Sequence, residues 1–355
     1  MKLEQVKEIA NAVLYEGYLL YPYRQSAIKN RTRWTFGAVY PREYSEASGG
    51  FDPWTMHTEC LVEGRGDDTS LAITVRCLHL LLRTVVRPGS KETNSVEELP
   101  NEWLPGRLAD EPLQEGQERE VTASNLSLSE LLAHSRRVPI EFSAARIVEH
   151  PANEPKTEII REQQAISGAF IITAEQVDTN SNLGDREKDV FKVTVEIENT
   201  TSETNAVTNR RDAILFQSFV STHTLLQVYN GSFISLLETP EALQAAVKEC
   251  QNQRTWPVLV GNPGECDVIL SSPIILYDYP QIAPESPGSL FDGSEIDEIL
   301  SLRILTLTDE EKEQMRQDER TREILERTEA LTPEQFMKLH GTIRELRTIG
   351  EGEKG

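Results

Sequence analysis

Two His/Cys pairs have the residue types that bind transition metals. His57 and Cys60 form the first pair, and Cys77 and His79 form the second. Thiolates and imidazoles favour zinc or iron. Residues i and i+2 of a strand share a face, so Cys77 and His79 would point the same way, whereas His57 and Cys60 would need a bulge to do so. Two interpretations stay open: a zinc or iron site, or buried thiols with core histidines.

No other pattern is typical of catalysis. The sequence contains no Gly-x-Ser-x-Gly, and Gly64-Arg65-Gly66 lacks the lysine of a phosphate-binding loop. Cys250 falls on the apolar face of a predicted helix. Cys266 lies between Glu265 and Asp267, whose charges disfavour a thiolate nucleophile. We therefore expect no catalytic residue and no cofactor apart from the zinc or iron above. An enzyme whose site is assembled from distant residues stays an alternative.

Charge and composition limit the classes of function. The 355 residues include 36 Lys or Arg and 58 Asp or Glu, which gives a net charge of −22. This acidity argues against nucleic-acid binding, which needs a basic surface. The longest apolar run, Leu78 to Leu82, is interrupted by His79, and nothing approaches the ~20 residues of a membrane helix. The first residues turn polar at once, which predicts no signal peptide and a cytoplasmic location.

Two hairpins are predicted from turn chemistry. Residues 58–63 and 70–86 are apolar or alternating, and the Gly-Arg-Gly-Asp-Asp run between them is typical of a turn. This hairpin would bring His57 beside Cys77. Asn230-Gly231 predicts a second hairpin, because both turn positions tolerate a positive φ. Residues 190–198 alternate between polar and apolar side chains, which predicts a half-buried strand.

The predicted helices lie mainly at the two ends of the chain. Val6, Ile9 and Val13 recur at helical spacing, and capping residues suggest helices from Ser294, Thr308 and Thr332 onward. We therefore predict an α+β fold, with an antiparallel β-rich body and a helical C-terminal third. The predicted segments are 1–86, an acidic proline-rich insertion or linker at 87–119, a β-rich domain at 120–290, and C-terminal helices at 291–355.

Two aromatic segments have the composition of an interaction surface. Residues 1–43 carry seven Lys or Arg and four Asp or Glu, a net of +3 on an otherwise acidic chain. Aromatic side chains and arginine are favoured anchors of protein interfaces, and prolines lower the entropic cost of binding. The alternative is that both segments are core strands and their edges. The candidate contact residues are Tyr21, Tyr23, Arg24, Lys29, Arg31, Arg33, Trp34, Tyr277, Tyr279 and Ile282.

The same two regions carry a family resemblance. The first runs from Leu14 to Tyr23 (LYEGYLLYPY) and continues to Lys29-Asn30-Arg31 and Trp34-Thr35-Phe36-Gly37. The second runs from Ser272 to Ser286 (SPIILYDYPQIAPES) and continues through Leu290–Gly293 and Glu295–Leu300. Together they resemble an uncharacterised bacterial family encoded beside high-affinity, oxygen-tolerant uptake [NiFe] hydrogenases and their maturation genes.

The resemblance implies a role in hydrogenase assembly, small-subunit handling or scaffolding, and it transfers no catalytic residue. The expected function is therefore a non-enzymatic accessory protein whose partners are hydrogenase subunits or maturation factors. The alternative is a metalloprotein in which His57, Cys60, Cys77 and His79 have a structural, sensory or catalytic role.

Overall fold

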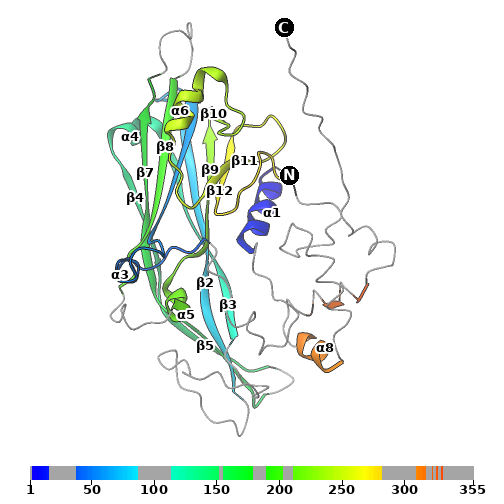
Figure 1. Cartoon of the computed structure of the whole chain (residues 1–355). Coiled ribbons are helices and arrows are strands. Elements are labelled where there is room, and N and C mark those ends of the chain that lie inside the picture. Colours follow the sequence, from blue (N-terminus) through cyan, green and yellow to red (C-terminus); the bar gives the residue numbers. More distant parts are fainter. Residues whose placement is uncertain are drawn as a thin grey trace. The chain divides into compact units, whose positions relative to one another are not determined.

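The computed structural model describes residues 2–15, 37–86, 113–151, 155–178, 189–202, 211–281 and 309–316, with 322, 325–326 and 329–330. The chain divides into two compact units. The first comprises Met1–Tyr15 and Thr32–Gln281, and the second comprises Glu16–Arg31 and Ile282–Gly355. The first unit is built around two antiparallel sheets, which Figure 1 shows with the N-terminal helix α1 beside them.

The smaller sheet has five strands and supplies one wall of the core. Its inward residues alternate with polar outward ones, as β8 illustrates: Val193 and Val195 are buried, and Lys192 and Thr194 are partly exposed on the other face. The alternation predicted for 190–198 is therefore confirmed. The strand order is β10 (Gly231–Ile234), β1 (Thr55–Gly64), β8 (Asp189–Asn199), β7 (Ile166–Gln176) and β4 (Arg136–Phe142).

The larger sheet has seven strands arranged around the 17-residue strand β2 (Ser70–Val86). One edge of β2 pairs with β9 over residues 70–78 and then with β6 over residues 81–86. The other edge pairs with β3 over residues 70–83. Beyond β9 the sheet continues with β12 and then β11, and beyond β6 it continues with β5. Their bounds are β3 (Leu113–Ser127), β5 (Ala145–Glu149), β6 (Glu158–Gln163), β9 (Val220–Tyr229), β11 (Trp256–Leu259) and β12 (Val268–Ser272).

The hydrophobic core joins the inner faces of the two sheets. Phe170 of β7 and Phe191 of β8 pack with Ile73 of β2 and Leu226 of β9 in one buried cluster. Burying aromatic and branched side chains from both sheets removes a large apolar area from water, which is the main stabilising term for such a fold.

Helix α1 (Lys2–Tyr15) covers part of the outer face of the larger sheet. Val6, Ile9 and Val13 pack against Val258 and Leu270, so the predicted apolar stripe is confirmed. The other short helical elements of the first unit connect strands. They are α3 (Arg42–Ala47), α4 (Leu128–Ala133), α5 (Arg211–Ile214), η2 (Leu215–Gln217), η3 (Glu241–Leu243) and α6 (Gln244–Glu249).

Both predicted hairpins are wrong as strand pairings. β1 pairs with β8 and β10, whereas β2 pairs with β3, β6 and β9. Asn230 does adopt a positive φ of 56°, but β9 before it and β10 after it belong to different sheets. In each case the chain turns sharply and crosses from one sheet to the other. Local turn chemistry sets the turn, and burial of apolar faces between the sheets sets the partner strand.

The predicted fold class, with its helical C-terminal third, is also wrong. The described part of the chain is dominated by two antiparallel sheets, and its helices are short. In the described part of 291–355, helix α8 (Asp309–Arg316) has seven charged or amide residues among its eight, which leaves little apolar surface to bury. Capping residues and charge were weak grounds for a packed helix, because helices in proteins depend on an apolar face.

The described residues around α8 are held partly by ion pairs. Glu329 lies 3.2 Å from Lys312 and 3.7 Å from Arg316, while Leu325 is fully buried. Residues 87–112 of the predicted insertion lie outside the described residues. The insertion was predicted to run to residue 119, whereas strand β3 already begins at Leu113. Over the ranges given above, no helix is long and apolar enough to cross a membrane.

Candidate functional site

The segment that follows β12 presents two large apolar side chains to solvent. Ile275 is 71% exposed and Tyr277 is 85% exposed. Their neighbours Ile274 and Leu276 point the other way and pack against the cluster formed by α1 and the larger sheet. The segment therefore has an inward apolar face that fixes it and an outward apolar face that meets water.

Asp278 and Tyr279 anchor the end of this segment. The Asp278 carboxylate accepts the backbone N–H of Leu259 at 2.8 Å and also the hydroxyl of Ser235. The Tyr279 backbone N–H donates to the Leu259 carbonyl at 2.7 Å, and Tyr279 takes a positive φ of 56°. Burial and the contact with Cys266 raise the pKa of Tyr279. These bonds hold the backbone beside Tyr277. The exposed Tyr277 side chain therefore projects into solvent from a fixed backbone.

The backbone of Gly37 lies against the side chain of Pro273, the residue that follows β12. Gly37 ends the first of the two stretches that carry the family resemblance, and Pro273 lies near the start of the second. A Cβ on Gly37 would lie 2.4 Å from Pro273 Cγ, and the Gly37 carbonyl accepts the backbone N–H of Thr222. Of the ten predicted contact residues, Tyr277 and Tyr279 are described. The other eight, Tyr21, Tyr23, Arg24, Lys29, Arg31, Arg33, Trp34 and Ile282, lie outside the described residues.

The four predicted metal ligands are not brought together. His57 and Cys60 belong to β1 in the smaller sheet, whereas Cys77 and His79 belong to β2 in the larger one. Both Cys60 and Cys77 are core residues, and burial raises the pKa of both thiols, that of Cys77 to about 12. Within the described part of the chain, no three His, Cys, Asp or Glu side chains are grouped to hold a metal ion. The predicted site depended on the hairpin that does not form.

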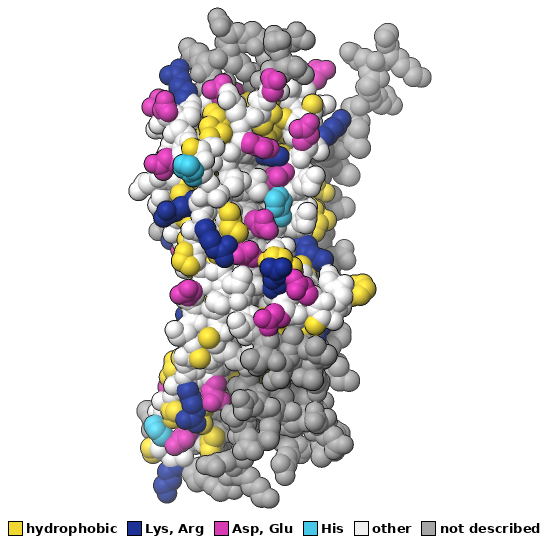
Figure 2. Space-filling view, turned by 90° about the vertical axis from the view of Figure 1, so that its left-hand side faces the viewer, with side chains coloured by type: hydrophobic (Ala, Val, Ile, Leu, Met, Phe, Trp, Pro, Cys, Tyr) yellow, Lys and Arg dark blue, Asp and Glu magenta, His cyan; other side chains and the backbone are white. Residues whose placement is uncertain are grey.

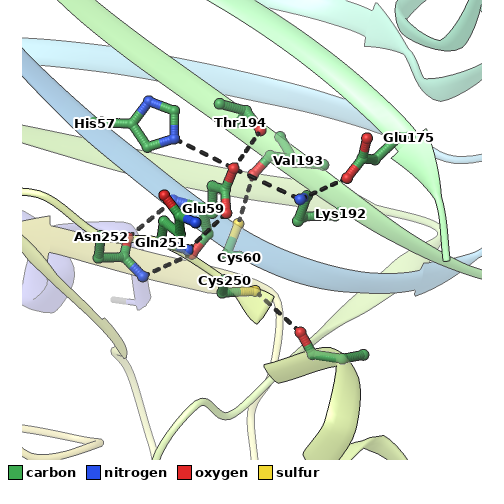
Figure 3. Close-up of polar contacts among 11 residues, drawn as sticks. His57, Glu59, Cys60, Glu175, Lys192, Val193, Thr194, Cys250, Gln251 and Asn252 are labelled. Atoms are coloured by element: carbon green, nitrogen blue, oxygen red, sulfur yellow. Dashed lines mark hydrogen bonds and ion pairs between the residues drawn. The ribbon is translucent and has the colours of Figure 1, made fainter. Parts of the chain in front are cut away.

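A buried carboxylate on β1 forms a network that the sequence did not reveal (Figure 3). Glu59 is 8% exposed and lies on the face of β1 opposite to Cys60. Its Oε2 accepts the backbone N–H of Gln251 at 2.6 Å, and its Oε1 accepts from His57 at 3.2 Å. Lys192 lies 3.7 Å from Oε1. In the sequence, Glu59 is simply an acidic residue within a predicted strand. Such residues are common, so the sequence did not indicate this network.

The Glu59 network joins β1 to the chain between α6 and β11. Asn252 exchanges two hydrogen bonds with the backbone of Glu59, at 2.8 and 3.2 Å. Burial alone would raise the pKa of Glu59, but the Gln251 N–H, His57 and Lys192 outweigh it and the net shift is downward. Both carboxylate oxygens already have partners, so Glu59 acts as an ionised anchor and is not poised as a general base.

The outer face of the smaller sheet carries mixed charge. Figure 2 shows acidic and basic side chains interspersed over this side of the molecule. Lys192 pairs with Glu175 at 2.5 Å, and Arg137 pairs with Glu198. Over the described residues of this face, charges of both signs are mixed, which does not favour a polyanion.

No protein-family model matches the sequence, and the search of curated proteins finds no relative.

Proposed function

We propose that this protein is a non-enzymatic accessory or scaffold protein that acts in the cytoplasm and binds a [NiFe] hydrogenase subunit or one of its maturation factors. The observation that carries the proposal is the exposed pair Ile275 and Tyr277 on an anchored segment. A segment whose backbone is fixed before binding loses less conformational entropy on association, and tyrosine is a frequent anchor of interfaces.

Two further points support this proposal. The exposed pair belongs to one of the two stretches that resemble the hydrogenase-associated family, and the end of the other stretch, Gly37, lies against Pro273 of the same segment. In addition, both carboxylate oxygens of the buried Glu59 are occupied by structural bonds. A binding role agrees with both points better than catalysis does.

The test is affinity purification of the tagged full-length protein from its host under hydrogenase-expressing conditions, with mass spectrometry of the eluate. The variant Ile275→Ser/Tyr277→Ser should lose hydrogenase subunits or maturation factors by at least tenfold. A matched control is Phe51→Ser, because Phe51 is also 85% exposed but lies before β1, in another part of the chain.

Thermal unfolding of both variants should match that of the unaltered protein, since the changed side chains are in water. The proposal would be overturned if the unaltered protein recovered neither class of partner. It would also fail if the double variant recovered as much partner as the Phe51→Ser control.

A further inference from the structure

Strand β5 forms one edge of the larger sheet in the described part of the chain. It pairs with β6 over Ala145–Glu149, and no other described strand lies on its far side. Figure 1 shows it in the lower part of the picture. All five of its residues are exposed, and so is His150 after them. The outer edge of β5 therefore presents backbone N–H and C=O groups that another strand can bind.

Two branched apolar side chains of β5 also meet solvent. Ile147 is 51% exposed and Val148 is 41% exposed. Successive residues of a strand point to opposite faces of the sheet, so each face of β5 carries one of these side chains. Branched apolar residues favour strand pairing, because they pack well against side chains of a neighbouring strand. The side chains of β5 thus suit a further strand as well as its backbone does.

The other edge strands of the described residues have features that oppose such pairing. β4 contains Pro139 and β11 contains Pro257, and proline has no backbone N–H to donate. In β3, Asn125 takes a positive φ of 56° beside a shift in register with β2. β10 has only four residues. β5 has neither a proline nor a register shift, so it is the edge best suited to accept a strand.

The charges of β5 are already neutralised by β6. Arg146 lies 3.2 Å from Glu162, and Glu149 lies 2.7 Å from Arg161. A partner attracted by charge would need unpaired charges of one sign, which these two pairs do not offer. Two copies of a chain with net charge −22 repel each other, and a locally neutral edge is where this repulsion acts least.

The sequence of β5 is compatible with pairing to its own copy. A two-fold axis perpendicular to the sheet relates two antiparallel strands and keeps every side chain on its own face. With Ile147 at this axis, Ile147 lies opposite its copy and forms an apolar pair. Arg146 lies opposite Val148, which its aliphatic stem can cover. Ala145 lies opposite Glu149, and its small side chain leaves room for the carboxylate. No position places like charges directly opposite each other.

We propose that β5 is a self-association surface, at which two copies of this chain pair antiparallel with Ile147 at the two-fold axis. The larger sheets of the two copies then form one continuous sheet. Pairing of two five-residue strands buries less than the ~1,200–2,000 Å² of a standard stable interface, so the dimer is weak and exchanges with monomer. This surface does not include Ile275 or Tyr277, and the proposal goes beyond hydrogenase binding and does not depend on it.

The first test is sedimentation velocity of the full-length protein over a hundredfold range of concentration. The average sedimentation coefficient should rise from that of a monomer toward that of a dimer. Amide exchange within Ala145–Glu149 should slow as the concentration rises, whereas exchange in the edge strand β4 (Arg136–Phe142) should not change. A protein that stays monomeric throughout would overturn the proposal, and so would a dimer whose β5 amides exchange at an unchanged rate.

Charge variants at Ile147 test the two-fold register. Ile147→Lys and Ile147→Glu each place two like charges opposite each other at the axis, so each should weaken the dimer at least tenfold. An equal mixture of the two variants should regain association, because opposite charges then meet across the axis. Leu132→Lys on α4 (Leu128–Ala133) is the matched control, since Leu132 is 40% exposed and the change in net charge is the same.

Thermal unfolding of the variants at low concentration should match that of the unaltered protein, because the changed side chains are exposed. The Leu132→Lys control should dimerise like the unaltered protein. Equal dimerisation by Ile147→Lys and Leu132→Lys would show that two copies associate through another surface. A mixture that associates no better than the separate Ile147 variants would exclude pairing about this residue. Either result would overturn the proposal.

Discussion

The backbone of Gly37 lies directly against the ring of Pro273, 236 positions later in the chain, and leaves no room for a side chain. Gly37 also adopts a positive φ of 54°. The contact joins the chain before α3 to the segment that follows β12. The contact between Gly37 and Pro273 also fixes the start of the segment that carries Ile275 and Tyr277. A change in this contact should therefore affect both the stability of the fold and the proposed binding.

Gly37→Ala should destabilise the protein by two separate costs. A non-glycine residue at this φ costs roughly 1–3 kcal/mol, and forcing a Cβ against Pro273 adds roughly 1–3 kcal/mol. Gly50→Ala is the matched control, because Gly50 also has a positive φ, of 78°, but has open space around it. Urea unfolding should show a larger loss for Gly37→Ala. Equal losses would mean that the Pro273 contact relaxes without cost.

Glu59→Gln should reduce the free energy of unfolding by roughly 1–3 kcal/mol, because the new amide turns a donor toward groups that now donate to Glu59. Glu175→Gln removes the other carboxylate that pairs with Lys192, but it is largely exposed and should change stability by less than about 0.5 kcal/mol. Amide exchange at Gln251 should quicken in Glu59→Gln alone. Unchanged exchange there would contradict the anchoring role.

Two buried histidines should make the protein sensitive to mild acid. Burial lowers the pKa of both His79 and His223 from 6.5 to about 4. Between these values the unfolded chain binds protons that the folded chain does not, so stability falls as pH falls. From pH 7 to pH 5 each histidine should contribute a loss of about 2 kcal/mol.

The check is urea unfolding at pH 7 and pH 5 for the unaltered protein and for His223→Asn. The variant should lose less stability across this interval, whatever its stability at pH 7. Glu59 does not obscure the result, because its pKa is shifted downward, away from this range. An identical pH dependence for the two proteins would show that His223 is accessible to protons in the folded state.

Charge reversal of Arg24, Arg31 and Arg33 to Glu should slow association with an acidic partner surface. Long-range attraction between opposite charges raises association rates, and salt screens it. The triple variant should therefore bind more slowly at low salt and differ little from the unaltered protein at high salt. Surface plasmon resonance with the recovered partner measures both rates. If binding at low salt is unchanged, these three arginines do not contribute to docking.

Local features of the fold were predictable from sequence. The period-2 alternation of 190–198 identified β8, and the apolar spacing of Val6, Ile9 and Val13 identified α1. These predictions succeeded because each pattern shows which face of a single helix or strand is buried. The assignment of Tyr277, Tyr279 and Ile282 to an interaction surface, made from the aromatic and proline content of their segment, stays a prediction.

Strand partners and the polar clusters were decided by tertiary structure alone. The turn after Gly64 and the Asn230-Gly231 turn both exist, yet each connects two different sheets. His57 and Cys77 consequently lie in separate sheets, while Glu59 meets Gln251, and Arg119 meets Phe142. A turn is specified by a few residues close in sequence. Strand pairing and buried polar contacts depend on packing two apolar sheet faces together, which involves residues far apart in the chain.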